Sequence, residues 1–128
     1  MRLLLDTHAF LWWLAGSERL PVRARLAIRD DTNSKLISAA SAWEIATKHR
    51  LGKLPGAGEL AHDIAGAIAG QGFDQLPISV QDAARAGGLP GPHRDPFDRV
   101  LIAQSLALNL VLISNEGVFD RYGVRRLW

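Results

Sequence analysis

Four acidic residues are interpreted as lying where short apolar runs give way to segments with helical spacing: Asp6, Glu44, Asp98 and Glu116. In an open parallel α/β sheet, such positions converge on one edge, at the carboxyl ends of the strands, where these folds place their ligand sites. Four carboxylates gathered there repel one another unless they are protonated or bridged by a cation. The pattern therefore predicts a divalent metal site. Mg²⁺ or Mn²⁺ is expected because both are hard ions that prefer oxygen donors.

Each of these residues also has an ordinary structural role open to it. Asp6 is placed to cap a following helix, and Glu44 completes with Ser41 the S-x-x-E pattern of a capping box. Asp98 falls in the first turn of an expected helix, where the helix dipole favours negative charge, and Glu116 suits an ordinary turn. Taken singly, capping is the commoner role. Capping does not require all four positions to be acidic, so their joint occurrence favours the metal site.

Short apolar runs predict the strands that would position these residues. Strands are expected over residues 3–6, 35–38, 76–79 and 111–114, with an edge strand over 124–128. Helical spacing predicts helices over residues 8–15, 21–31, 40–51, 59–70 and 96–109, and loops over 52–58 and 87–94. Strands alternating with helices predict an α/β fold, a three-layer α/β/α sandwich around a mostly parallel sheet of four to five strands.

The size and composition of the chain are those of a globular protein. With 128 residues, 48% of them hydrophobic and 22% charged, a single domain over residues 1–128 is expected. No apolar stretch approaches the roughly 20 residues of a membrane span, and the run at residues 3–5 is too short for a secretory signal. The absence of cysteine excludes disulfides and thiolate chemistry. A cytoplasmic protein with no membrane partner is therefore predicted.

The charge balance favours a polyanionic partner. The formal net charge is +2, and setting aside the four proposed site carboxylates leaves 15 basic residues against nine acidic ones. The sequence pI of about 9.5 likewise indicates that the protein is positively charged at neutral pH. Many small bacterial proteins are equally basic, so charge alone leaves the question of a nucleic acid open.

Four ordered segments carry a family resemblance. They are similar to PIN-domain ribonucleases, specifically the VapC-type toxins of type II toxin–antitoxin systems, and they span nearly the whole chain in family order. The segments are LLLDTHAFLWWL (3–14), SAASAWEIATKHRLGKL (38–54), HRDPFDRVLIAQSL (93–106) and LISNEGVFDRYGV (112–124).

The resemblance implies a metal-dependent endoribonuclease that hydrolyses RNA phosphodiester bonds. It assigns Asp6 and Asp98 as direct ligands of Mg²⁺ or Mn²⁺, and makes Glu44 the residue that orients or deprotonates the attacking water. Glu116 stands where the family commonly has aspartate, and its extra methylene changes the reach of the carboxylate. Asp95 competes as a third ligand, although as an expected N-cap its carboxylate would be occupied by backbone amides.

Further contacts and partners are also expected. Thr7 and Ser38 carry hydroxyls near the predicted site, and His93 and Arg94 lie in the preceding loop, where they are candidates to contact substrate. The resemblance implies RNA as substrate and a cognate antitoxin as protein partner. The apolar faces around residues 10–14 and 60–68 are candidates for antitoxin or homodimer contacts.

Two rival functions remain at this point. A haloacid-dehalogenase-type phosphatase also uses an aspartate after its first strand, but its motif requires a second aspartate two residues on, where this chain has His8. The other is a catalytically weak or inactive PIN-fold module that binds RNA or an antitoxin, having lost turnover through Glu116.

Overall fold

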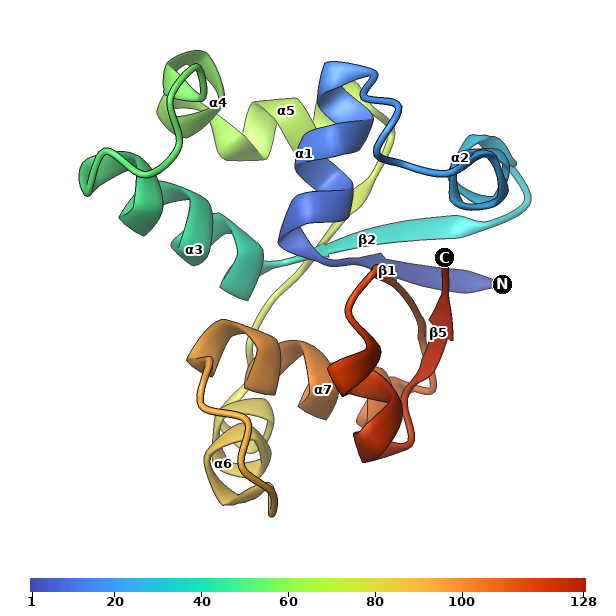
Figure 1. The fold of residues 1–128 in the computed structure, drawn as a ribbon, viewed down its shortest axis with the longest axis vertical. Helices are drawn as coiled ribbons and strands as arrows, with labels where there is room; N and C mark the ends of the chain where they lie inside the picture. The colour runs from blue at the N-terminus through green and yellow to red at the C-terminus, as the bar shows by residue number, and fades with distance from the viewer.

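The apolar runs of the sequence form a five-stranded sheet at the centre of the molecule (Figure 1). The computed structural model describes residues 1–128. The strand order is β3-β2-β1-β4-β5, and every neighbouring pair is parallel. The strands are β1 (Arg2–Leu5), β2 (Ser34–Ser38), β3 (Asp74–Leu76), β4 (Val111–Ile113) and β5 (Arg125–Leu127). This sheet confirms the predicted α/β fold, with β5 at the expected edge.

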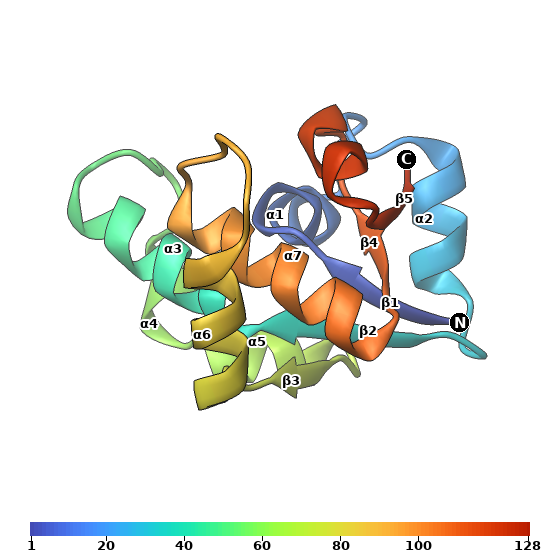
Figure 2. The ribbon, with the colours of Figure 1, turned by 90° about the horizontal axis from the view of Figure 1, so that it is seen from below.

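Helices cover both faces of this sheet and complete the three layers (Figures 1 and 2). They are α1 (Thr7–Ala15), α2 (Val22–Arg29), α3 (Ala39–Arg50), α4 (Gly58–His62), α5 (Ile64–Gly70), α6 (Val80–Gly88), α7 (Pro96–Leu108) and the 3₁₀ helix η1 (Gly117–Tyr122). None of these helices combines the length and the apolar character needed to cross a bilayer.

The alternation of side chains along the strands divides the core in two. Leu3 and Leu5 of β1 point to one face, where they pack with residues of α1, α2 and α5, and Leu4 points to the other, where it packs with residues of α6, α7 and η1. All three leucines are fully buried. Burying each stabilises the fold by about 2 kcal/mol, which explains why so short a strand holds the centre of the sheet.

The third strand lies earlier than predicted. The sequence places it over residues 76–79, but β3 is Asp74–Leu76. Pro77 has no N–H to donate to the ladder, and Ser79 instead caps α6, so the strand ends before both. No range was predicted for helix α6, although the Ile78-Ser79 pair is typical of a strand-to-helix boundary. A capping box starts the helix: Ser79 Oγ accepts from Asp82 N at 3.0 Å, and Asp82 Oδ2 accepts from Ser79 N at 3.1 Å.

The prediction of a helix over residues 59–70 is correct for most of the segment but wrong in its continuity, because the helix divides into α4 and α5. The break is at Asp63, whose φ of −152° and ψ of 71° are not helical. Its side chain restarts the helix by accepting from Gly66 N at 2.9 Å. A smaller error concerns Pro21, which precedes the first residue of α2 as its N-cap instead of occupying the first helical position.

The register of the sheet brings distant residues to one edge. Leu5 of β1 pairs with Ile37 of β2 on one side and with Ile113 of β4 on the other. The next residue of each strand therefore stands at the same level, at the carboxyl end of the sheet. The chain leaves β1 toward β2 on one side and returns to β4 on the other, so a topological switch point lies between β1 and β4. Open α/β sheets form their ligand sites at such points.

Candidate active site

Asp6 lies at the switch point, directly after β1. Its side chain caps α1, because Oδ1 accepts from Ala9 N at 2.8 Å. The residue is buried, and this burial raises the pKa of Asp6 to about 6. Hydrogen bonds with the Ser114 side chain and the Ala9 amide oppose the rise, whereas the charge of Glu116 adds to it. Asp6 is thus both a helix cap and a buried carboxyl group whose charge is destabilised by its surroundings.

Glu44 projects from the second turn of α3 and does not form the capping box that its sequence pattern allows. The N-cap of α3 is Ser38, whose Oγ accepts from Ala40 N at 3.1 Å. Glu44 is buried, and both of its oxygens have partners. Thr7 Oγ1 lies 2.5 Å from Oε1, and Lys48 Nζ lies 2.5 Å from Oε2. The lysine compensates a charge that would otherwise be costly to bury.

Asp98 reaches the same space from the first turn of α7, not from the end of an apolar run as predicted. Asp95 is the N-cap of this helix, and its Oδ1 accepts from Asp98 N at 3.0 Å, as the sequence predicts. The Asp98 carboxylate contacts His93 Nε2 at 2.9 Å. Burial, followed by the charges of Asp95, Glu116 and Glu44, raises the pKa of Asp98 to about 7, and the His93 contact opposes this rise.

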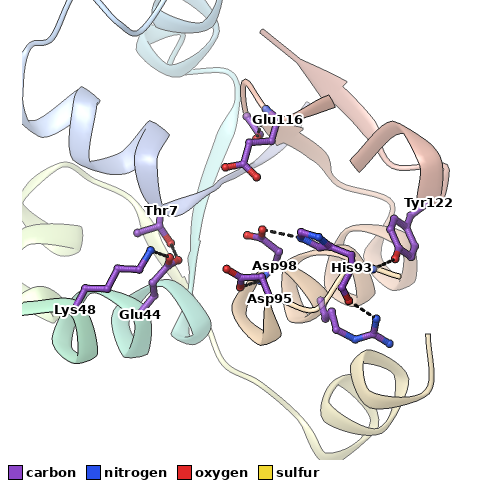
Figure 3. A network of polar contacts seen from close by, with 10 residues as sticks. Thr7, Glu44, Lys48, His93, Asp95, Asp98, Glu116 and Tyr122 are labelled. Atoms are coloured by element: carbon purple, nitrogen blue, oxygen red, sulfur yellow. Dashed lines mark hydrogen bonds and ion pairs between the residues drawn. The ribbon is translucent and has the colours of Figure 1, made fainter. Parts of the chain in front are cut away.

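Glu116 follows β4 and stands at the N-terminus of η1 without capping it. It is partly exposed, and its backbone N–H donates to Ser114 Oγ at 3.0 Å. The charge of Glu116 raises the pKa of both Asp6 and Asp98. It therefore lies within electrostatic range of two of the other acids. Figure 3 shows Glu44, Asp98 and Glu116 directed toward one shared space from three different elements.

The chemistry of this donor set fits a hard divalent cation. No three histidine, aspartate or glutamate side chains lie close enough together to hold one metal ion as the structure stands. The side chains that converge nevertheless offer carboxylate oxygens, the donors that Mg²⁺ and Mn²⁺ prefer. The raised pKa values of Asp6 and Asp98 show that the site destabilises their negative charge. A bound cation would offset the cost of ionising either of these carboxyl groups.

The residues predicted to contact substrate have different surroundings. Thr7 is buried and holds Glu44, and Ser38 is fully buried as the cap of α3, so a direct contact between Ser38 and RNA would require its exposure. His93 is partly buried against Asp98, whereas the neighbouring Arg94 is exposed. Sequence reasoning did not assign Lys48 to the site. Its position four residues after Glu44, on the same helix face, was the available signal.

A second missed residue, Arg99, holds the loop that carries His93. Its guanidinium donates to three backbone carbonyl oxygens: Nε to Ala86 at 2.8 Å, Nη1 to His93 at 2.8 Å and Nη2 to Leu89 at 2.5 Å. The planar guanidinium carries several N–H donors in a fixed geometry, so it can bind three carbonyl oxygens at once, whereas a lysine ammonium cannot reach all three. On the other side of the loop, the Tyr122 hydroxyl accepts from His93 N at 3.3 Å. No feature of the sequence predicted these contacts.

A family model and a segment of a named protein match this chain in sequence. Residues 3–125 match the family model described as the PIN domain. A 31-residue segment is 64% identical to Ribonuclease VapC16 of Mycobacterium tuberculosis, and this match spans 24% of the chain and 22% of the length of that relative.

Solved structures share the fold at low sequence identity. One is the crystal structure of VapBC2 from Rickettsia felis bound to a DNA fragment from their promoter, where a chain aligns with a TM-score of 0.66 and 15% identity, covering 99% of this chain and 98% of the other. Another is VapBC-1 from nontypeable Haemophilus influenzae, with a TM-score of 0.63, 16% identity, and coverage of 99% and 97%. At these identities the likeness concerns the arrangement of the elements.

Proposed function

Because this chain belongs to the PIN-domain family, we propose that it is a metal-dependent endoribonuclease that acts as a toxin and is neutralised by a cognate antitoxin. The observation that supports the proposal is that Glu116 lies within electrostatic range of both Asp6 and Asp98, and Glu44 within range of Asp98, near the carboxyl end of the sheet. A basic chain around an acidic centre suits a polyanionic substrate held by cations. The segment similar to a named ribonuclease adds independent support.

The side chains divide the chemistry among them according to their contacts. Asp6 and Asp98 would hold Mg²⁺ or Mn²⁺, which when bound activates water and offsets charge on the reacting phosphate. Glu44 is fixed by Thr7 and Lys48, so its remaining lone pairs have a defined direction. In this proposal Glu44 orients the attacking water and accepts its proton as the water oxygen bonds to phosphorus. The P–O3′ bond then breaks and the leaving O3′ takes a proton from solvent, which gives a 5′-phosphate and a 3′-hydroxyl.

The direct test is cleavage of single-stranded RNA by the purified protein. Activity is expected with Mg²⁺ or Mn²⁺, and EDTA should abolish it. Asp6→Asn and Asp98→Asn should each reduce the rate by about 100-fold or more, and Glu44→Gln by about 10²- to 10⁴-fold. Asp6→Asn is a conservative probe, because asparagine caps a helix as well as aspartate does.

Two control variants sharpen this test. Asp31→Asn changes an exposed aspartate outside the site and should leave cleavage unchanged. Asp95→Asn preserves the cap of α7, so a large loss of activity would assign Asp95 as a ligand. Cleavage that persists with EDTA, in Asp6→Asn and in Asp98→Asn would refute the metal-dependent mechanism. RNA binding without any cleavage would instead support an inactive RNA-binding module.

We also propose that a protein partner covers the acidic site. The excess negative charge there would suit an arginine from an antitoxin, in a bidentate contact with a carboxylate. Apolar surface lies close by on α3 and its C-cap, where Trp43 is 56% and Leu51 is 51% exposed. A co-expressed antitoxin should co-elute on size exclusion and inhibit cleavage. Light scattering on the toxin alone tests the predicted homodimer.

A further inference from the structure

A cavity of about 470 Å³ adjoins the acidic site, and none of the proposed catalytic residues lines it. Its walls are the loop over residues 89–93, Leu106 of α7, and Val118, Arg121 and Tyr122 of η1. This volume falls within the range of small-ligand sites, about 300 to 1,000 Å³. The pocket is therefore large enough for one nucleoside and too small for a folded segment of another protein.

One side chain joins this pocket to the acidic site. His93 lines the pocket, and its Nε2 lies 2.9 Å from Asp98 Oδ2. The imidazole also packs edge-on against the buried ring of Phe119, with centroids 6.5 Å apart. Figure 3 shows His93 between Asp98 on one side and Tyr122 on the other. A nucleic acid strand with a phosphate at the carboxylates would therefore bring a neighbouring nucleotide to the pocket.

The walls of the pocket are held in place before any ligand binds. Arg99 fixes the carbonyl oxygens of Leu89 and His93, at the two ends of the loop. Gly91, with a φ of +99°, lies so close to Tyr122 that a Cβ there would stand 2.7 Å from the tyrosine hydroxyl oxygen. Only glycine allows this approach without strain. A site whose walls are already ordered spends less free energy on ordering when it binds.

The chemistry of the walls suits a nucleobase. Tyr122 contributes an aromatic ring, and Pro90 and Pro92 contribute apolar surface. Single-stranded RNA is commonly recognised by stacking its unpaired bases on aromatic side chains. Arg121, exposed at the same pocket, supplies the positive charge that a phosphate next to the base requires.

We propose that this pocket binds one nucleobase of the RNA substrate, adjacent to the phosphate that is cleaved, with Arg121 contacting the backbone beside that base. The proposal rests on the proposed ribonuclease function and deepens it, because a base held here would set the sequence preference of cleavage. His93 forms the boundary between the base site and the carboxylates.

The test fills the pocket and measures substrate recognition. Leu106→Trp adds bulk at a wall position that is 44% exposed, so the fold should tolerate it. Its matched control is Leu26→Trp, where the leucine is 57% exposed on α2, a helix that packs on the other face of the sheet. With short oligoribonucleotides, Leu106→Trp should raise KM by about 5-fold or more, the effect of one lost stacked base, and relax the sequence preference. The control should change neither.

A second measurement does not depend on catalysis. Nucleoside monophosphates are added without divalent metal, and amide NMR shifts are followed. The shifts should be confined to the loop over residues 89–93 and to η1. Arg121→Gln, at an exposed position, should weaken binding of the monophosphate but leave binding of the matching nucleoside unchanged.

The outcomes separate the two proposals. If the wild type cleaves RNA and Leu106→Trp has the same KM and sequence preference, the proposal of a nucleobase site is refuted and the proposed ribonuclease function is retained. If no RNA is cleaved but monophosphates shift the pocket amides, the ribonuclease fails and a nucleotide site remains. If Leu106→Trp loses a protein partner while cleaving RNA normally, the pocket is a protein contact and the base site is overturned.

Discussion

Asp6→Asn should stabilise the metal-free protein at pH 8, although it removes a proposed catalytic group. The substitution keeps the size of the side chain and its ability to accept from the Ala9 amide, so the cap of α1 survives. What it removes is a negative charge that burial destabilises. Asparagine carries no charge at any pH, and the energetic cost of ionising residue 6 disappears.

The magnitude follows from the pKa of the carboxyl group in the two states. Burial raises the pKa of Asp6 from 3.8 to about 6, so between these values the folded protein binds more protons than the unfolded chain. Stability must then fall as the pH rises through this window and stay level above it. A pKa difference of this size corresponds to a loss of about 2 to 3 kcal/mol. The Asn variant should escape this loss.

The assay is urea denaturation in EDTA at pH 5 and at pH 8. The wild type should be the less stable at pH 8, and Asp6→Asn should exceed it there by about 2 to 3 kcal/mol. Some pH dependence should persist in the variant, because burial also raises the pKa of Asp98 to about 7. Exposed Asp31, changed to Asn, serves as the control and should shift neither curve. A wild type more stable at pH 8 than at pH 5 would refute the reasoning.

Three further predictions concern residues around the site and one helix start. Lys48→Met should cost about 1 to 3 kcal/mol in urea denaturation, because it leaves the buried Glu44 carboxylate without its cation; a Glu44→Gln change added to it should recover part of that loss. Arg99→Lys should accelerate amide hydrogen exchange in the loop over residues 89–93 and cost about 1 to 3 kcal/mol, since lysine cannot serve three carbonyls. An alanine in place of a helical glycine usually stabilises a protein by about 1 kcal/mol, but Gly66→Ala should not, because its Cβ would lie 2.1 Å from Asp63 Oδ2 and displace the side chain that caps α5. In an Asp63→Ala background, where no cap can be lost, Gly66→Ala should raise the free energy of unfolding.

The sequence predicted the sheet, and with it the positions of Asp6 and Glu116, because both follow from local pattern. A continuous apolar run of three buried leucines makes β1 readable, and parallel pairing brings the ends of β1, β2 and β4 to one level. Asp6 and Glu116 were therefore predictable as neighbours. The prediction for Asp98 assumed that an apolar strand directly precedes it. Asp98 instead lies in the first turn of α7, which follows helix α6 and a loop.

What the sequence could not predict depends on tertiary contacts. The S-x-x-E pattern at Ser41 and Glu44 satisfies every local rule for a capping box, yet β2 extends to Ser38, which pairs with Leu76 and becomes the cap instead. Three residues further along, Ser41 is already inside the helix and faces Thr7. Where the sheet ends thus decides which serine caps, and the available local signal was the Ile-Ser pair at residues 37–38, one of three such pairs that end apolar runs. The three carbonyls held by Arg99 are likewise far from it in sequence.

The four carboxylates have different hydrogen-bond and ion-pair partners, which is why the proposed mechanism gives them different roles. Asp6 commits one oxygen to the Ala9 amide, and Glu44 has both oxygens paired, so direct coordination by Glu44 would require breaking a buried ion pair. Glu116 makes no ion pair within the chain and is partly exposed, so its side chain can reorient without breaking an ion pair. In the proposed mechanism its longer side chain gives this carboxylate additional reach toward a bound cation.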